Sequence, residues 1–233
     1  MRQLFLDTET TGLYAEQGDR VIEIACVEMV NRKLTGEYLH LYVNPGRDSH
    51  EEALRIHGIT SEFLRDKPSF AQVAQTFLDF VRDAEVVAHN AAFDLGFLNA
   101  ELAGAGLAPL KEHVLGIVDT LALAKEMFPG KRNNLDALCD RLEVDRSART
   151  LHGALLDAQL LADVYIHMTR GQDALLMDTA AHERSGPARA RADLSTLQLP
   201  VPRANAQEQA AHLEVLQLIG KASGGKTIWK SEH

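Results

Sequence analysis

The sequence predicts an α/β protein in which a mixed sheet is flanked by helices. Three β-compatible segments come first, and strands then alternate with segments of helical periodicity up to about Thr169. This order is typical of a sheet covered by helices. The periodicity weakens after that point, so we expect a flexible C-terminal tail.

Five strands are predicted from short runs rich in β-branched and aromatic residues. Asn31–Gly36 is expected to form a hairpin-like turn between the second strand and the third. The predicted strands are Gln3–Glu9, Val21–Val30, Glu37–Val43, Glu85–His89 and Val114–Val118.

Helices are predicted from apolar residues at helical spacing and from polar residues that favour N-caps. Ser69 precedes the first, with Phe70, Val73 and Phe77 on one face. Gly104 and Gly106 are expected to end the second. The predicted helices after the first are Ala91–Ala103 capped by Asn90, a helix capped by Asp119, Leu135–Leu142 opened by Asn133 or Asn134, Leu155–Met168, and Ala206–Ile219.

Composition excludes several classes of protein. The chain is 45% hydrophobic and 24% charged, as in ordinary soluble globular proteins. Its apolar runs are shorter than the roughly 18 residues that a membrane span needs. Asp7 and Glu9 follow a short apolar N-terminus, which excludes a signal peptide. Two isolated cysteines, Cys26 and Cys139, indicate neither disulfides nor a zinc site and fit a reducing cytoplasm.

The net charge is −9, and all of this excess lies in the first 170 residues. Such a balance argues against a broad basic face for nucleic acid. If the N-terminal part acts on a polyanion, either bound cations or a partner that delivers the substrate must offset the repulsion.

Acidic residues recur at three places in this part. Asp7 and Glu9 stand two apart on a strand and therefore share a face, although alone they could be solvated acids at a strand end. Asp94 lies in the first turn of a helix among apolar neighbours, where it could simply oppose the helix dipole. Asp157 lies in an apolar helical turn with no evident Lys or Arg partner. An unpaired buried carboxylate is costly, so a metal ion is the economical explanation.

Four carboxylates without a His or Cys cluster form an all-oxygen site, which suits Mg²⁺ or Mn²⁺ better than zinc. Two such ions about 3.5–4 Å apart can bracket a phosphodiester. His152 could then serve as general base. It stands five residues before Asp157 and cannot share its helical face, so we expect it in a loop just ahead of the helix. A lone histidine is more often structural, and only the acidic constellation favours the catalytic interpretation.

Three motifs carry a specific resemblance. DTETTG at Asp7–Gly12, HNAAFD at His89–Asp94 and HGALLDA at His152–Ala158 resemble, in order and spacing, the motifs of DEDD-superfamily exonucleases of the histidine subclass. IHGIT at Ile56–Thr60, FPGKRN at Phe128–Asn133 and RTLHGALLDAQLLA at Arg149–Ala162 are similar to the family of proofreading epsilon subunits of bacterial DNA polymerase III.

The resemblance covers residues 1–170 and implies a ribonuclease-H-like fold with a five-stranded mixed sheet. It implies that Asp7, Glu9, Asp94 and Asp157 hold two divalent cations and that His152 accepts a proton. It also implies that Thr10, Gly12, Glu52 and His57, together with Asp7, Glu9 and Asp157, contact the terminal nucleotide. From composition alone, Glu52 is a solvated charge and His57 a turn residue. Lys131 and Arg132 are more simply a solvated pair than phosphate ligands.

The tail extends the same resemblance. Gln172–Met177, with Leu175 and Met177 as its apolar residues, resembles a motif that docks on the β sliding clamp, and Leu197–Val201 is a poorer alternative. Residues 171–205 are expected to be this motif and a linker. Residues 206–233, with Trp229 as an anchor, resemble the segment that binds the polymerase alpha subunit. The resemblance implies frayed or single-stranded DNA 3′ ends as substrate, a small theta-like subunit as a further partner, and a bacterial cytoplasmic replisome as location.

Two other functions remain open from the sequence. A stand-alone DEDD exonuclease for RNA trimming or DNA repair would share the five catalytic residues but would not need the tail. A non-catalytic replisome scaffold would need the tail but not the intact acidic set.

Overall fold

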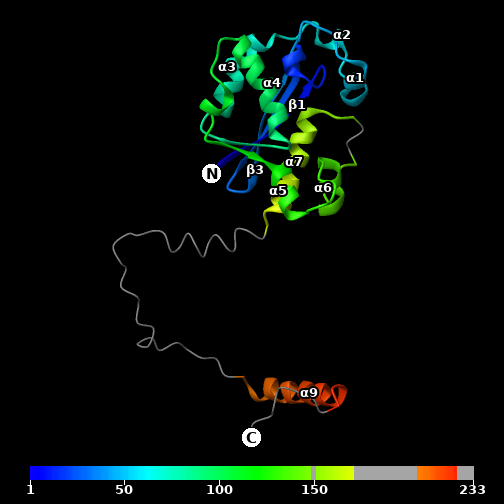
Figure 1. Cartoon of the computed structure of the whole chain (residues 1–233). Coiled ribbons are helices and arrows are strands. Elements are labelled where there is room, and N and C mark those ends of the chain that lie inside the picture. The colour runs from blue at the N-terminus through cyan, green and yellow to red at the C-terminus, as the bar shows by residue number, and fades with distance from the viewer. Residues whose placement is uncertain (148–150, 171–203, 225–233) are drawn as a thin grey trace, which may run out of the picture. The chain divides into compact units, whose positions relative to one another are not determined.

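The computed structural model describes residues 1–147, 151–170 and 204–224 of the 233-residue chain. Contacts divide the chain into two units, Met1–His182 and Glu183–His233. Figure 1 shows a sheet with surrounding helices in the first unit and helix α9 in the second. Within the described ranges, no helix has the length and apolarity that a membrane crossing requires. The proposed boundaries at 170 and 205 stay predictions.

Five strands form one mixed sheet in the order β3-β2-β1-β4-β5. The first three pair antiparallel, and β4 joins β1 and β5 in parallel. This arrangement confirms the predicted fold class. The strands are β1 Arg2–Thr10, β2 Val21–Val30, β3 Lys33–Tyr42, β4 Glu85–Ala88 and β5 Gly116–Asp119.

The predicted turn Asn31–Gly36 is wrong in length. Only Asn31 and Arg32 form the turn, both with positive φ (50° and 63°), and Val30 pairs directly with Lys33. A two-residue turn with both φ values positive matches the right-handed twist of a hairpin. The third strand therefore begins at Lys33, four residues before its predicted start.

The pairing of β1 with β2 contains a bulge. Glu9 lies opposite Glu23, whereas the next residue, Thr10, lies opposite Val21, so Ile22 is the extra residue of β2. A bulge bends its strand and increases the local twist. The irregularity falls at the end of β1, beside the acidic residues.

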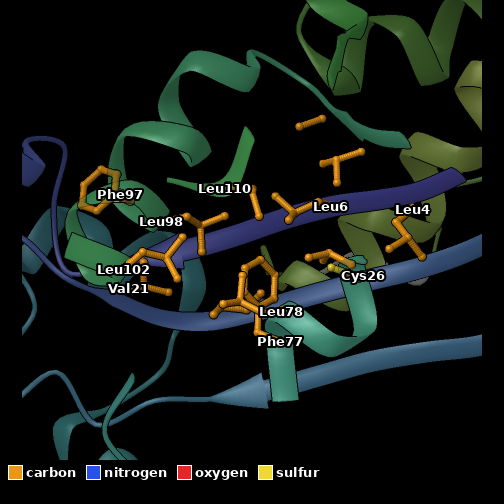
Figure 2. Close-up of a cluster of buried hydrophobic side chains, with 14 of the residues drawn as sticks. Leu4, Leu6, Val21, Cys26, Phe77, Leu78, Phe97, Leu98, Leu102 and Leu110 are labelled. Carbon is orange, nitrogen blue, oxygen red and sulfur yellow. The ribbon is translucent and has the colours of Figure 1, made fainter. Parts of the chain in front are cut away.

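Helices cover both faces of the sheet, as expected (Figure 1). Helices α3 (Phe70–Val81) and α4 (Ala91–Gly104) pack on one face. The cluster in Figure 2 includes Leu4 and Leu6 of β1 together with side chains of both helices. Helix α7 (Ala154–Met168) packs on the other face against Phe5 of β1.

Among the described residues, the first unit also contains four more α-helices and two 3-10 turns. Helices α5 and α6 pack on the outer side of α7 through a third apolar cluster. The short helices α1 and α2, which periodicity did not indicate, follow β3. The bounds are α1 Glu51–His57, α2 Ser61–Leu64, α5 Thr120–Met127 and α6 Leu135–Leu142, with 3-10 turns at Ala15–Gln17 and Leu110–Glu112. Helix α9 of the second unit is Ala206–Ala222.

Most predicted helix starts are confirmed. Asp119 accepts hydrogen bonds from the first turn of α5, and Asn134 accepts one from the Ala137 N–H. Ser69 is the N-cap of α3. Asn90 occupies the N-cap position of α4, but its side chain makes no capping bond. Its φ is instead +66°, and its own N–H donates to Asp119 Oδ1 over 3.1 Å.

Candidate active site

The alternation of β1 explains where its acids lie. Leu4 and Leu6 face α3 and α4, whereas Phe5 faces α7. Asp7 and Glu9 continue the face of Phe5, since alternate residues of a strand share a side. At this end of the sheet α7 begins, so both carboxylates lie near its first turn.

Asp94 reaches the same end of β1 from helix α4. It is buried, with 4% of its surface exposed, and its Oδ1 accepts a hydrogen bond of 2.7 Å from the Thr8 hydroxyl. The left-handed turn at Asn90 separates β4 from α4, so Asp94 enters the site from the first turn of that helix. The predicted position of Asp94 is confirmed.

Asp157 and His152 come from the start of α7. His152 lies in the loop before the helix, as predicted, and its Nδ1 is 3.2 Å from Asp157 Oδ2. Asp157 is buried, whereas about half of the His152 side chain is exposed. One ligand atom each of Glu9, His152 and Asp157 lie within 4.8 Å of one another. Residues more than 140 positions apart therefore converge.

The acids of the cluster perturb one another. Burial raises the pKa of Asp7 well above its ordinary value, and nearby carboxylates raise it further. These neighbours are Asp94, Asp157, Glu9 and Glu23. Burial also raises the pKa of Asp94, to about 7, although the Thr8 hydroxyl acts in the opposite direction. Without cations, the protein therefore disfavours full ionisation of this site.

The donor set fits divalent cations. Carboxylate oxygens dominate it, and no Lys or Arg contributes to the pKa shift of Asp7. Hard cations such as Mg²⁺ and Mn²⁺ prefer such oxygens and would offset the mutual repulsion. The residues that could hold them are the four predicted ones, Asp7, Glu9, Asp94 and Asp157.

A cavity of about 460 Å³ adjoins the cluster. Its wall includes the predicted contacts Glu9, Thr10, Gly12, Glu52 and His57. A volume of this order is in the usual range for a small-molecule site. Sequence reasoning missed the other lining residues because nothing in their spacing marks them. They are Thr8, Leu13, Tyr14, Gln17, Asp19, Arg47, His50, Ala53, Ile56 and Phe93.

His57 presents a hydrogen-bonding group to this region. It ends helix α1 and is buried, with 5% of its surface exposed. Its Nδ1 accepts the Ile59 N–H over 2.9 Å, whereas its buried Nε2 has no hydrogen-bond partner among the described residues. Burial lowers the pKa of His57. A neutral ring with an Nε2 hydrogen can thus donate to a bound oxygen.

Asp19 is a further buried acid that the sequence did not mark. It contacts the Tyr14 N–H (3.1 Å), His50 Nε2 (3.0 Å) and Arg47 (3.3 Å). Burial opposes its ionisation, but these donors and cations outweigh burial and lower the pKa of Asp19. The network joins the loop after β1 to His50, the N-cap of α1.

The remaining predicted residues lie elsewhere. Lys131 and Arg132 are exposed and do not line the cavity. Gln172, Leu175, Met177 and Trp229 lie outside the described residues.

Acids on the end of a strand and on two helices beside a nucleotide-sized cavity place this protein in the class of DEDD exonucleases. A family model described as RNase_T: Exonuclease matches residues 4–165. The chain is 48% identical to DNA polymerase III subunit epsilon of Escherichia coli over 238 residues, covering 99% of this chain and 98% of that protein. It therefore belongs to this exonuclease family and, within it, to the proofreading 3′→5′ exonucleases that are epsilon subunits of DNA polymerase III.

Other relatives agree. The epsilon subunit of Pasteurella multocida is 46% identical over 241 residues, covering 98% of this chain and 93% of that protein. Exonuclease X, solved with 5′-overhanging duplex DNA, superposes with a TM-score of 0.57 at 28% identity and covers 74% of this chain and 92% of its own. E. coli exonuclease I, solved in a zinc-bound complex with single-stranded DNA, shares the fold alone. Its TM-score is 0.63 at 20% identity, and the match covers 78% of this chain and 43% of the exonuclease I chain.

Proposed function

We propose that this chain hydrolyses the last phosphodiester of a DNA 3′ end with Asp7, Glu9, Asp94, Asp157 and His152. The observation that carries the proposal is the convergence of the four acids from β1, α4 and α7 with His152 from the loop before α7. Folding alone does not explain a cluster of four carboxylates, since like charges that are not compensated repel one another and destabilise the folded state.

Two Mg²⁺ or Mn²⁺ ions are proposed as cofactors. When bound, they supply activation of the attacking water and charge stabilisation at the leaving oxygen. Asp7, whose pKa is raised by the other three carboxylates of the set, would be among the residues that hold these ions. The raised pKa values of Asp7 and Asp94 support the proposal, because bound cations would stabilise the ionised carboxylates that burial disfavours.

His152 is proposed as the proton acceptor. Its Nδ1 lies 3.2 Å from Asp157 Oδ2, and we propose that the imidazole takes the proton from the attacking water. Asp157 thereby orients the ring and stabilises the charged imidazolium. The exposure of about half of the side chain allows the ring to adjust when DNA enters.

The adjoining cavity is proposed to hold the terminal nucleotide. His57 Nε2 would donate to an oxygen of this nucleotide, and Glu52 would accept from its terminal hydroxyl. Thr10 and the backbone turn at Gly12 complete the wall on the side of β1, where the Thr10 hydroxyl already donates to the Gly12 carbonyl over 2.6 Å.

Partners are proposed from the tail. Gln172–Met177 would dock on the β sliding clamp, and residues 206–233 with Trp229 would bind the polymerase alpha subunit. A small theta-like subunit is the third proposed partner, and the proposed location is a bacterial cytoplasmic replisome. Exposed apolar side chains on α9 support a binding role; Leu213 is 50% exposed and Leu218 65%. Such docking would deliver a frayed primer end to an acidic nuclease.

A direct test compares the full chain with Asp7→Ala on 3′-labelled single-stranded DNA in Mg²⁺ or Mn²⁺. We expect the variant to lose at least several orders of magnitude of rate. Its thermal stability without metal should hold or rise, because the substitution removes a partly buried acid from among like charges. Digestion by Asp7→Ala as fast as by the parent chain would refute the proposed roles.

A further inference from the structure

A fifth carboxylate, that of Glu23, lies beside the site without belonging to the predicted set. Glu23 lies on β2, opposite Glu9 on one side and Tyr42 on the other. It is 2% exposed. On the same face of β2, Ala25 and Val27 pack under α7. A carboxylate buried on this face needs partners to compensate for its lost hydration.

Glu23 has such partners on two elements. Its Oε1 is 2.6 Å from His40 Nε2 on β3. Its Oε2 accepts the Ala154 N–H over 3.1 Å. The two oxygens of one side chain thus join strand β3 to the start of helix α7.

Ala154 is the first residue of α7, and the first N–H groups of a helix lack partners within the helix. A serine, threonine or aspartate at the N-cap would normally accept one of them. Here the N-cap is Gly153, which has no side chain and makes no such bond. Glu23 supplies the missing acceptor from a neighbouring strand, with a negative charge that also suits a helix N-terminus.

This contact fixes the segment that carries His152 and Asp157. The His152 N–H donates to the Ile56 carbonyl over 3.1 Å, and two residues later the Ala154 N–H donates to Glu23. Gly153, between these two anchors, is extended, with φ −158° and ψ 130°. Without the second anchor, Gly153 would allow the backbone before α7 a wide range of conformations.

We propose that Glu23 is a positioning residue for the exonuclease reaction: it caps α7 from strand β2 and thereby holds His152 and Asp157 in register with Glu9. The inference rests on the proposed function. Glu23 is not proposed as a metal ligand, because both of its oxygens are already directed to His40 and Ala154. Groups that support catalytic residues in this way typically contribute about 10–100-fold to activity.

The test uses Glu23→Ala, Glu23→Gln and the parent as full-length chains. The amide oxygen of Gln can still accept the Ala154 N–H, and its NH₂ group can donate to a neutral His40. We expect Glu23→Ala to lower kcat on single-stranded DNA by about 10–100-fold with KM within about threefold. Glu23→Gln should stay within about threefold of the parent, since a cap needs an acceptor rather than a charge.

Glu101→Ala is the matched control. Glu101 is also buried, at 5% exposure, and also accepts a backbone N–H, that of Val21 over 3.2 Å, but it lies on α4 away from α7. It should lower the melting temperature by a similar amount while kcat at 25 °C stays within about threefold. An equal loss of kcat in Glu101→Ala and Glu23→Ala at equal melting temperature would overturn the proposal.

A readout independent of activity is amide hydrogen exchange in the metal-free chain. Glu23→Ala should speed exchange in residues 152–157 at least tenfold over the parent, and Glu101→Ala should not. Unchanged exchange there in Glu23→Ala would overturn the proposal, as would a Glu23→Gln variant as inactive as Glu23→Ala. If the parent itself releases no nucleotides with Mg²⁺ or Mn²⁺, the proposed function fails, whereas the exchange experiment still decides the capping role.

Discussion

Substituting Gly12 by alanine should damage both the stability and the substrate affinity of this protein. A Cβ at Gly12 would lie 2.6 Å from Asp19 Cγ and closer still to Asp19 Oδ2 and His50 Cδ2. Asp19 cannot move away cheaply, because Tyr14, His50 and Arg47 hold its carboxylate. Something must therefore shift in a buried, charged network.

The magnitude follows from these contacts. Overpacking a tight site costs about 1–3 kcal/mol, and a weakened hydrogen bond to a charged group adds about 1.5–3 kcal/mol. We expect a loss of about 2–4 kcal/mol, since the two costs partly replace each other. For a domain of this size that is a fall in melting temperature of about 4–16 °C. Displacement of His50, the N-cap of α1, should also raise KM about tenfold, because α1 carries Glu52 and His57.

Differential scanning fluorimetry and initial rates on single-stranded DNA would measure the two effects. Gly96→Ala is the control, because it places the same methyl group on the exposed side of α4 with nothing within 4 Å. It should stabilise the chain by about 0.5–1 kcal/mol, since alanine favours a helix interior. A Gly12→Ala variant that melts within about 2 °C of the parent and keeps its KM would refute the reasoning.

Three further outcomes are expected. In EDTA, the free energy of unfolding should fall as pH rises from about 4 toward 7, because folding raises the pKa of Asp94 to about 7 and the stabilising contribution of the protonated group is lost as it ionises. Asp94→Asn should flatten this pH dependence. Urea titrations at several pH values measure it, and an unchanged slope in the variant would show that the assignment to Asp94 is wrong. His152→Ala should lose about 10²–10⁴-fold in kcat and retain Mn²⁺ affinity by calorimetry, whereas weakened metal binding with normal turnover would contradict the base role. A chain ending at residue 170 should keep hydrolysis but no longer copurify with the polymerase, and undiminished copurification would place the docking surface elsewhere.

Long periodic elements were predictable because local pattern and tertiary packing agree in them. The β-compatible segment Gln3–Glu9 predicts a strand, and β1 spans Arg2–Thr10, with Leu4 and Leu6 on one face and Phe5 on the other. Helix α7 was likewise predicted to within one residue of its start. Short α1 escaped prediction, because its apolar residues Leu54 and Ile56 are partly exposed and give no clear helical stripe.

The acids of the site could be predicted from the sequence, since Asp94 and Asp157 stand out among apolar neighbours. The residues that contact these acids in the folded protein could not be predicted. Glu23 reads as one polar position in an alternating strand, and only the β1–β2 register places it opposite Glu9. The loop position of His152 was predicted, but its 3.2 Å approach to Asp157 depends on how the start of α7 is held.

The bulge at Ile22 has a consequence for which changes the protein can tolerate. Because Glu9 pairs with Glu23 and Thr10 with Val21, a chain without Ile22 could keep both pairings in a regular ladder, and only the local bend would be lost. Arg20, which pairs with Glu101, and Asp19, which holds His50, lie just before β2, so loss of the bend would shift both. At this corner the extra residue sets the direction in which the chain enters β2 and leaves the faces of the strand unchanged.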